Sequence, residues 1–155
     1  MNSFYLFPGK LAAFKKETIV STLLGSCVAV ALHDPTTGIG GLNHYLLSES
    51  GPETDGNSAR YGVFAIPMLV EECVRLGANR NCLQAKIYGG ANVTGVAALG
   101  PLIGKRNIEV AEEILKSLGI PIVDKDVGGG TARTIKFNTA TFSVIHQCGG
   151  IKTCG

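Results

Sequence analysis

Residues 27–47 constrain the fold of this chain more than any other segment. An apolar run at 27–32 and an apolar-rich run at 39–47 flank the string Pro35-Thr-Thr-Gly38. Proline presets the dihedral angle of the second residue of a turn, and glycine tolerates positive φ. The segment therefore predicts two antiparallel strands joined in a hairpin.

Two groups of complementary chemistry lie on this predicted hairpin. Cys27 opens its first strand, and His44 lies seventeen residues later, well along the second. A thiol attacks an acyl carbon as its thiolate, and its pKa of roughly 8.5 calls for a nearby imidazole or backbone dipole. The pattern predicts Cys27 as nucleophile and His44 as base, with backbone N–H groups of Gly25, Ser26 and Cys27 as donors to an oxyanion.

The alternative for Cys27 is a buried structural thiol, which is the common environment of free cysteine. The other two histidines are weaker candidates for the base. His33 lies six residues from Cys27 on the same strand and is expected on the opposite face, before the turn, while His146 lies far away near the carboxyl end.

The rest of the chain reads as an α+β domain. Apolar residues recur at helical spacing within 58–77 and 107–118, which predicts two helices, each ended by a glycine. Pro67 is expected to kink the first helix or to lie near its start, and Asn107 is expected to cap the second. Further strands are expected at 17–23, 83–88, 120–127, 132–138 and 141–146. Strands outnumber helices, so a layered architecture follows.

Length and charge exclude several classes of protein. The 155 residues fit one domain, 1–155. The net charge is +2, and the Lys and Arg residues are scattered along the chain, so we do not expect nucleic acid as a partner. The longest apolar run is far shorter than the roughly 20 residues of a membrane helix, and no secretory signal is evident, so we expect no membrane insertion and a cytoplasmic protein.

Five cysteines without a secretory signal indicate reduced thiols. Cys73 lies on an expected helix face and is assigned to the core. His146, Cys148 and Cys154 are too unevenly spaced for a zinc site, and the pair Glu53 and Asp55 lacks further ligands, so we expect no metal and no cofactor.

Several strings resemble the CheD family, the chemoreceptor glutamine deamidases of chemotaxis. They are TLLGSCVAVALHDPTTGIGGLNH at 22–44, KIYGGAN at 86–92, IGKRN at 103–107 and DVGGG at 126–130, and they follow the family's order. The resemblance implies a sandwich of mixed β-sheets with two long helices packed on one side. It also implies hydrolysis of receptor glutamine side chains through a thioester, with chemoreceptors as substrates and a CheC-type phosphatase as a further partner. The alternative is an adaptor that binds CheC and receptors without catalysis.

The same resemblance implies a hydroxyl, six residues before the cysteine, that orients the histidine. That position is Ser21, with Thr22 beside it. Successive side chains of a strand point to opposite faces, and Ser21 shares the odd-numbered parity of Cys27, so Ser21 is the predicted orienter. The glycine pairs at 89–90 and 128–129 are either plain turns or places where the backbone approaches a substrate.

Overall fold

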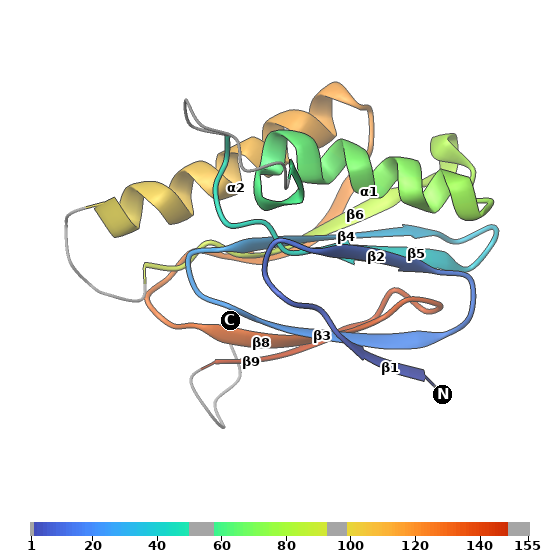
Figure 1. The fold of residues 1–155 in the computed structure, drawn as a ribbon, viewed down its shortest axis with the longest axis horizontal. Coiled ribbons are helices and arrows are strands. Elements are labelled where there is room, and N and C mark those ends of the chain that lie inside the picture. The colour runs from blue at the N-terminus through green and yellow to red at the C-terminus, as the bar shows by residue number, and fades with distance from the viewer. Residues whose placement is uncertain (1, 50–57, 93–98, 149–155) are drawn as a thin grey trace.

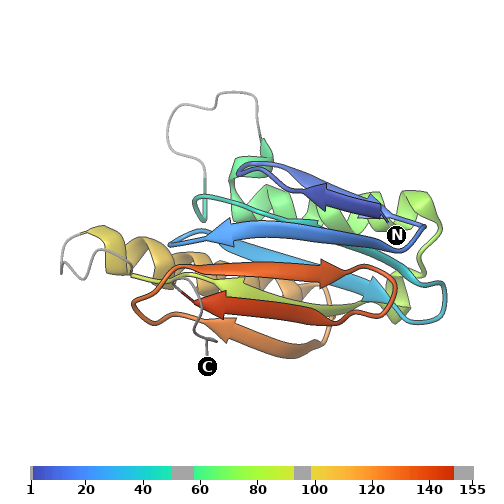
Figure 2. The ribbon, with the colours of Figure 1, turned by 90° about the horizontal axis from the view of Figure 1, so that it is seen from below.

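The computed structural model describes residues 2–49, 58–92 and 99–148. These residues form three stacked layers. Two helices cover one face of a five-stranded sheet, and a four-stranded sheet covers its other face (Figure 1). Figure 2 shows the molecule from the side of the four-stranded sheet. The expected α+β sandwich of mixed sheets, with both helices on one side, is confirmed.

The five-stranded sheet has the strand order β2-β5-β4-β6-β7. Its members are Leu11–Phe14, Ile39–Asn43, Val28–Asp34, Gln84–Gly89 and Ile122–Val127. All neighbours run antiparallel except β6 and β7, which are parallel.

The four-stranded sheet has the order β1-β3-β8-β9. Its members are Asn2–Tyr5, Thr18–Leu24, Arg133–Asn138 and Val144–Cys148. The β1–β3 pair is parallel and the other two pairs are antiparallel. Neither β1 nor β2 was expected from the sequence, whereas every other strand was.

The hairpin of β4 and β5 forms as predicted. Ala31 pairs with Leu42 in an antiparallel ladder, and Gly38 closes the turn with φ 76° and an N–H that donates to the carbonyl of Asp34 at 2.8 Å. All seven residues of β4 are buried, because this strand lies in the middle of a sheet covered on both faces. Its continuous apolar run is the sequence signature of that position.

Helix α1, Gly62–Leu76, matches the predicted helix and includes Pro67 in its second turn. Gly77 ends it with φ 119°. Helix α2, Leu99–Ser117, begins eight residues before the predicted start at 107. The assignment of Asn107 as a helix cap is therefore wrong, because this residue lies in the middle of α2.

Two apolar cores separate the layers. One lies between the helices and the five-stranded sheet and includes Leu32, Leu69, Cys73 and Leu115. The other lies between the two sheets and includes Leu24, Ala29 and Phe137. Cys73 is fully buried in the first core, as expected.

Some sequence-based expectations fall outside the described residues: the loop at 50–57 with Glu53 and Asp55, and the tail with Cys154. The expectation of reduced thiols is wrong for Cys148, which is disulfide-bonded. Within 2–49, 58–92 and 99–148, no helix is long and apolar enough to cross a membrane. The same residues contain no cluster of three or more His, Cys, Asp or Glu side chains placed to hold a metal ion.

Candidate active site

Cys27 lies where the chain crosses from one sheet to the other. Residues 25–27 connect the end of β3 in the four-stranded sheet to the start of β4 in the five-stranded sheet. The Cys27 side chain is partly buried against the core between the sheets. Its sulfur therefore sits at the rim of the space that the two sheets enclose.

His44 is a diagonal neighbour of Cys27. Just beyond the hairpin ladder, Val28 and Tyr45 form an isolated antiparallel bridge, with N–H to carbonyl distances of 3.2 and 3.0 Å. This register sets His44 opposite Ala29, two residues from Cys27 on the same face of the sheet. Diagonal neighbours on one face are within reach of long or aromatic side chains. The predicted approach of Cys27 and His44 through the hairpin thus has a structural basis.

Thr22, rather than Ser21, is the hydroxyl that meets His44. The Thr22 Oγ1 lies 2.7 Å from His44 Nδ1, and both side chains are buried. This hydrogen bond joins β3 of one sheet to the segment after β5 of the other.

The prediction that Ser21 faces His44 is therefore wrong. In β3 the inward residues have even numbers, and Ser21 lies on the opposite face of the strand. In β4 the residues that face the same space have odd numbers, such as Ala29. Alternation does not carry across residues 25–27, because the chain changes sheets there, so the parity of Cys27 says nothing about β3.

The hydrogen bonds of Thr22 fix the tautomer of His44. Thr22 Oγ1 donates to the carbonyl of Leu6 at 2.7 Å, and a carbonyl can only accept. A hydroxyl has one proton, so toward His44 the Thr22 oxygen acts as acceptor and Nδ1 carries the hydrogen. The neutral imidazole then has its lone pair on Nε2, the nitrogen that remains available to take a proton.

Burial favours the uncharged forms of both Cys27 and His44. Burial lowers the pKa of His44 from 6.5 to about 4. Burial also raises the pKa of the Cys27 thiol, although the N–H of Cys27, hydrogen-bonded to its own sulfur, acts in the opposite direction. At neutral pH both shifts favour an uncharged thiol beside an uncharged imidazole.

The carbonyls of residues 25–27 are all held from one side. The Gly25 carbonyl accepts from Ala91 N at 2.9 Å and the Cys27 carbonyl from Gly90 N at 2.8 Å. The Ser26 carbonyl accepts from Asn107 Nδ2 at 3.0 Å. In a trans peptide group the N–H points away from the carbonyl, so the N–H groups of Ser26 and Cys27 face away from β6 and α2. Their role as oxyanion donors stays a prediction.

Glycines make this close packing possible. A Cβ on Gly89 would stand 2.2 Å from the Cys27 carbonyl oxygen, and a Cβ on Gly104 would stand 2.5 Å from the Gly90 oxygen. Gly90 has φ 72°. The close approach at the 89–90 pair is to residues 25–27 and to α2 of the same chain, which is neither of the two alternatives expected from the sequence. The GSC, GGAN and IGKRN strings therefore meet at one place.

The amino-terminal segment supports His44 from the other side. Gly9 N donates to the His44 carbonyl at 2.8 Å, and His44 N donates to the Lys10 carbonyl at 3.1 Å. Together with the Leu6 carbonyl, these contacts fix the backbone and the ring of His44. Sequence reasoning missed this support, for which the turn-forming Pro8-Gly9 pair was the only local signal.

The other histidines have separate surroundings. His33 Nδ1 contacts the Thr139 carbonyl at 2.9 Å, and its ring stacks on Phe142. His146 Nδ1 lies 3.0 Å from Asp126, which also pairs with Arg133. The expectation that His33 faces away from Cys27 is wrong, because residues an even number apart in a strand share a face, and His33 points between the sheets like Ala29. Its own contacts are with Thr139 and Phe142 in the connection between β8 and β9.

Comparison with known proteins places these features in a family. A sequence model described as CheD chemotactic sensory transduction matches residues 46–147. "Probable chemoreceptor glutamine deamidase CheD 1" of Anaeromyxobacter dehalogenans is 43% identical over 86% of this chain and 77% of its own length. "Probable chemoreceptor glutamine deamidase CheD" of Caulobacter sp. is 44% identical over 78% of this chain and 63% of its own length. The protein of the same name from Xanthomonas campestris is 39% identical over 92% of this chain and 71% of its own length.

Among solved structures, the hypothetical protein YfiH of Bacillus licheniformis matches with a TM-score of 0.48 and 14% identity, covering 77% of this chain and 49% of its own. The family match rests on the sequence relatives, whose identity extends through most of the chain. The chain belongs to the CheD family.

Proposed function

We propose that this protein is a chemoreceptor glutamine deamidase that hydrolyses the carboxamide of glutamine side chains through a thioester on Cys27. The observation that carries the proposal is the hydrogen bond from His44 Nδ1 to Thr22, because it leaves Nε2 as a base diagonally across from Cys27. The relatives named as chemoreceptor glutamine deamidases supply the substrate class.

The first half of the reaction forms the thioester. As the Cys27 sulfur attacks the amide carbon, its proton passes to His44 Nε2, and the oxyanion accepts hydrogen bonds from the N–H groups of Cys27 and Ser26. The imidazolium then protonates the nitrogen, and ammonia leaves. The C–N bond is replaced by a C–S bond, with no change in oxidation state.

The second half restores the enzyme. His44, again neutral, takes a proton from water as the water oxygen attacks the thioester carbon. The C–S bond breaks, and the proton on His44 returns to the Cys27 sulfur. The products are a glutamate carboxylate and ammonia, so each turnover adds one negative charge to the receptor.

Thr22 matters because His44 carries its positive charge only transiently, in surroundings that disfavour it. His44 is 1% exposed, so its imidazolium is poorly solvated. The Thr22 oxygen accepts the Nδ1 hydrogen in both the neutral and the charged states, and this bond strengthens with charge. Thr22 therefore takes the orienting role that we first assigned to Ser21.

Access to the site suits a side chain presented on another protein. Cys27 is partly exposed while His44 is buried, so a substrate would reach the sulfur from outside without first contacting the imidazole. We expect cytoplasmic receptor helices to present their glutamines in this way and free glutamine to be a poor substrate. A cytoplasmic location of the enzyme follows from this proposal.

The test is incubation with the recombinant cytoplasmic fragment of a chemoreceptor from the same organism. Ammonia release and conversion of specific glutamines to glutamate by mass spectrometry are expected, and Cys27→Ala and Cys27→Ser should abolish both while keeping the native circular dichroism spectrum. Turnover retained in Cys27→Ala would rule out the thioester mechanism.

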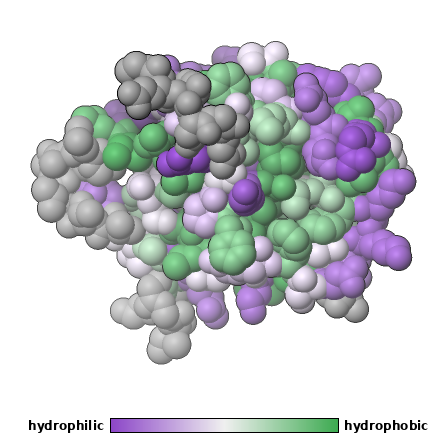
Figure 3. All heavy atoms as spheres, in the orientation of Figure 1, coloured by the Kyte–Doolittle hydropathy of each residue, from purple (hydrophilic) through white to green (hydrophobic). Residues whose placement is uncertain are grey.

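A CheC-type phosphatase is a second proposed partner. A cavity of about 330 Å³ lies beside the site, lined by Leu47, Ser48, Leu102, Ile103, Arg106 and Asn107. Leu47 and Leu102 are 40% and 63% exposed and line the same cavity, so they offer an apolar surface to another protein. Figure 3 shows hydrophobic surface at the end of the molecule where α2 begins.

If CheC and the receptor share this surface, adding CheC from the same organism should inhibit receptor deamidation competitively. Simultaneous binding with undiminished turnover would separate the two surfaces.

A further inference from the structure

Asn107 is a buried polar residue of α2 that reaches the two segments on which Cys27 and His44 lie. Its side-chain nitrogen Nδ2 donates to the Ser26 carbonyl at 3.0 Å and to the Leu46 carbonyl at 2.9 Å. Both partners can only accept, so the orientation of the amide is determined by its neighbours. Asn107 is 1% exposed. One side chain thus joins the residue before Cys27 to the strand segment that carries His44.

The bond to Ser26 acts on the peptide group that precedes Cys27. The Ser26 carbonyl and the Cys27 N–H belong to the same planar trans peptide and point in opposite directions. Holding the carbonyl against α2 therefore sets the direction of the N–H on the other side. That N–H is the first of the donors that the proposed oxyanion needs, and it also contacts the Cys27 sulfur.

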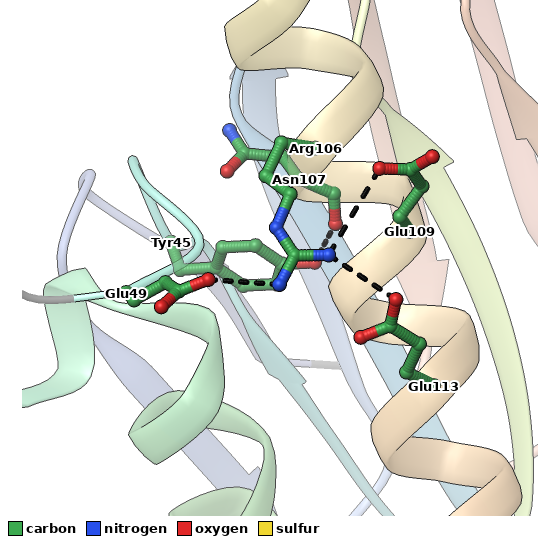
Figure 4. A network of polar contacts seen from close by, with 6 residues as sticks. All are labelled: Tyr45, Glu49, Arg106, Asn107, Glu109 and Glu113. Atoms are coloured by element: carbon green, nitrogen blue, oxygen red, sulfur yellow. Dashed lines mark hydrogen bonds and ion pairs between the residues drawn. The ribbon is translucent and has the colours of Figure 1, made fainter.

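The backbone of Asn107 is itself fixed. The Tyr45 hydroxyl donates to the Asn107 carbonyl at 2.5 Å, and both residues are buried. Next to it, Arg106 reaches Glu49 at 2.8 Å and Glu113 at 3.1 Å (Figure 4). The arginine pairs are exposed and contribute little, so the Tyr45 contact is the firm link between α2 and the segment after β5.

We infer that Asn107 is a positioning residue of the deamidation reaction: by holding the Ser26 carbonyl, it directs the Cys27 N–H at the oxyanion. This inference rests on the proposed function. Asn107 touches neither the substrate nor the reacting sulfur and acts only through the direction of the Cys27 N–H. The oxyanion depends on this donor directly, whereas burial outweighs the same N–H in setting the pKa of the Cys27 thiol. That separation makes it testable.

The decisive experiment compares two reactions of Cys27 in the Asn107→Ala variant, deamidation of the receptor fragment and alkylation of the thiol. Deamidation of the receptor fragment passes through an oxyanion, whereas alkylation of Cys27 by iodoacetamide does not. Loss of one oxyanion donor costs on the order of 100- to 1000-fold in kcat, and a misdirected donor costs less. We expect kcat to fall about 10- to 100-fold, KM to stay within about twofold, and the Cys27 alkylation rate to stay within about threefold.

Asn107→Ser, which keeps a small polar side chain, should behave similarly to Asn107→Ala. Asn138→Ala is the matched control. Asn138 also holds backbone groups, the N–H of Ala140 and of Thr141, at a turn of the other sheet. The Asn138→Ala variant should leave kcat and the Cys27 alkylation rate unchanged.

Each outcome separates the inference from the proposed function. An unmodified protein that releases no ammonia removes the proposed function and this inference with it. An active native enzyme whose Asn107 variants keep full kcat overturns the inference alone. Parallel loss of kcat and of Cys27 alkylation, or failure of both Asn107 variants to fold at the assay temperature, would make Asn107 a structural residue and equally overturn it.

Discussion

At the scale of single residues, the site depends on which hydroxyl meets the imidazole. Thr22 both donates to the Leu6 carbonyl and accepts from His44, so it controls the tautomer as well as the orientation of the ring. Ser21 lies on the other face of the strand and can do neither. The two neighbouring hydroxyls therefore make a natural pair of variant and control.

Thr22→Val keeps the shape of the side chain and removes its hydroxyl. Without the acceptor, His44 can take the other tautomer or rotate, and we expect kcat to fall about 10- to 100-fold, as for other losses of an orienting group. Ser21→Ala should stay within about twofold of the native kcat. Steady-state ammonia release from the receptor fragment measures both. A greater loss in Ser21→Ala, with the fold intact, would restore the first assignment.

The Cys27 thiol should react as a neutral thiol rather than as part of a preformed ion pair. Burial raises its pKa and lowers that of His44, so the alkylation rate of Cys27 by iodoacetamide should keep rising with pH above the range in which a free thiol ionises, roughly pH 8.5. A plateau below pH 7 would instead indicate a thiolate-imidazolium pair.

Cys73 provides the internal control in the same alkylation experiment. It is fully buried, and burial raises its pKa to about 12. Peptide mapping after brief alkylation should find label on Cys27 before Cys73. Earlier labelling of Cys73 would contradict the assignment of the reactive thiol.

At the scale of elements, the contact of α2 with the end of β6 holds residues 25–27 in place. Gly104 of α2 allows the helix to approach Gly90, whose N–H holds the Cys27 carbonyl. In Gly104→Ala the new Cβ would stand 2.5 Å from the Gly90 oxygen, so helix and strand must move apart. We expect a loss of about 1–3 kcal/mol in unfolding free energy and a lower kcat.

Gly130→Ala is the matched control for this contact. Its added Cβ would meet only the Asn92 carbonyl oxygen, at an ordinary 3.8 Å. Urea unfolding and ammonia release should both stay close to native. Equal destabilisation by the two substitutions would show that the close approach of α2 to β6 has no special importance.

The sequence predicted those elements whose pattern is local. The hairpin follows from two apolar runs and one turn, and α1 follows from its helical spacing. Strands β1 and β2 were missed because they are four residues long and have little burial pattern: β1 is exposed along its whole length. The start of α2 was missed because an Asn favoured for caps stands in mid-helix, where long-range bonds to Ser26 and Leu46 outweigh local preference.

The candidate site shows the same division between features set by local sequence and features set by long-range contacts. The spacing of Cys27 and His44 on a hairpin could be read from the chain, since their approach depends on one local turn. The choice of Thr22 could not, because it depends on how β3 of one sheet faces β5 of another. Asn107 and the Leu6 carbonyl are distant in sequence from the groups they hold, and no local pattern marks them.

At the scale of the whole molecule, His44 couples folding to pH, because it lies buried between the two sheets. Its pKa is about 4 in the folded protein, against 6.5 for an exposed histidine. Between these values the unfolded chain binds a proton that the folded protein does not, so stability is full above pH 6.5 and falls as the pH drops toward 4. At about 1.4 kcal/mol per pH unit, His44 accounts for a loss of up to about 3 kcal/mol.

Urea unfolding of the native protein and of His44→Gln, from pH 7.5 to 4, isolates this contribution. Burial also lowers the pKa of His33, which acts in the same direction but is common to both proteins. Burial would raise the pKa of Asp34, but hydrogen bonds from Thr36 and Asn79 outweigh it and hold this pKa at about 2, so the Asp34 contribution is lost below pH 3.8. The native protein should therefore lose more stability than the variant, and mainly between pH 6.5 and 4. Parallel curves for the two proteins would mean that His44 is solvated in the native state, which would also remove the reason for a neutral resting pair.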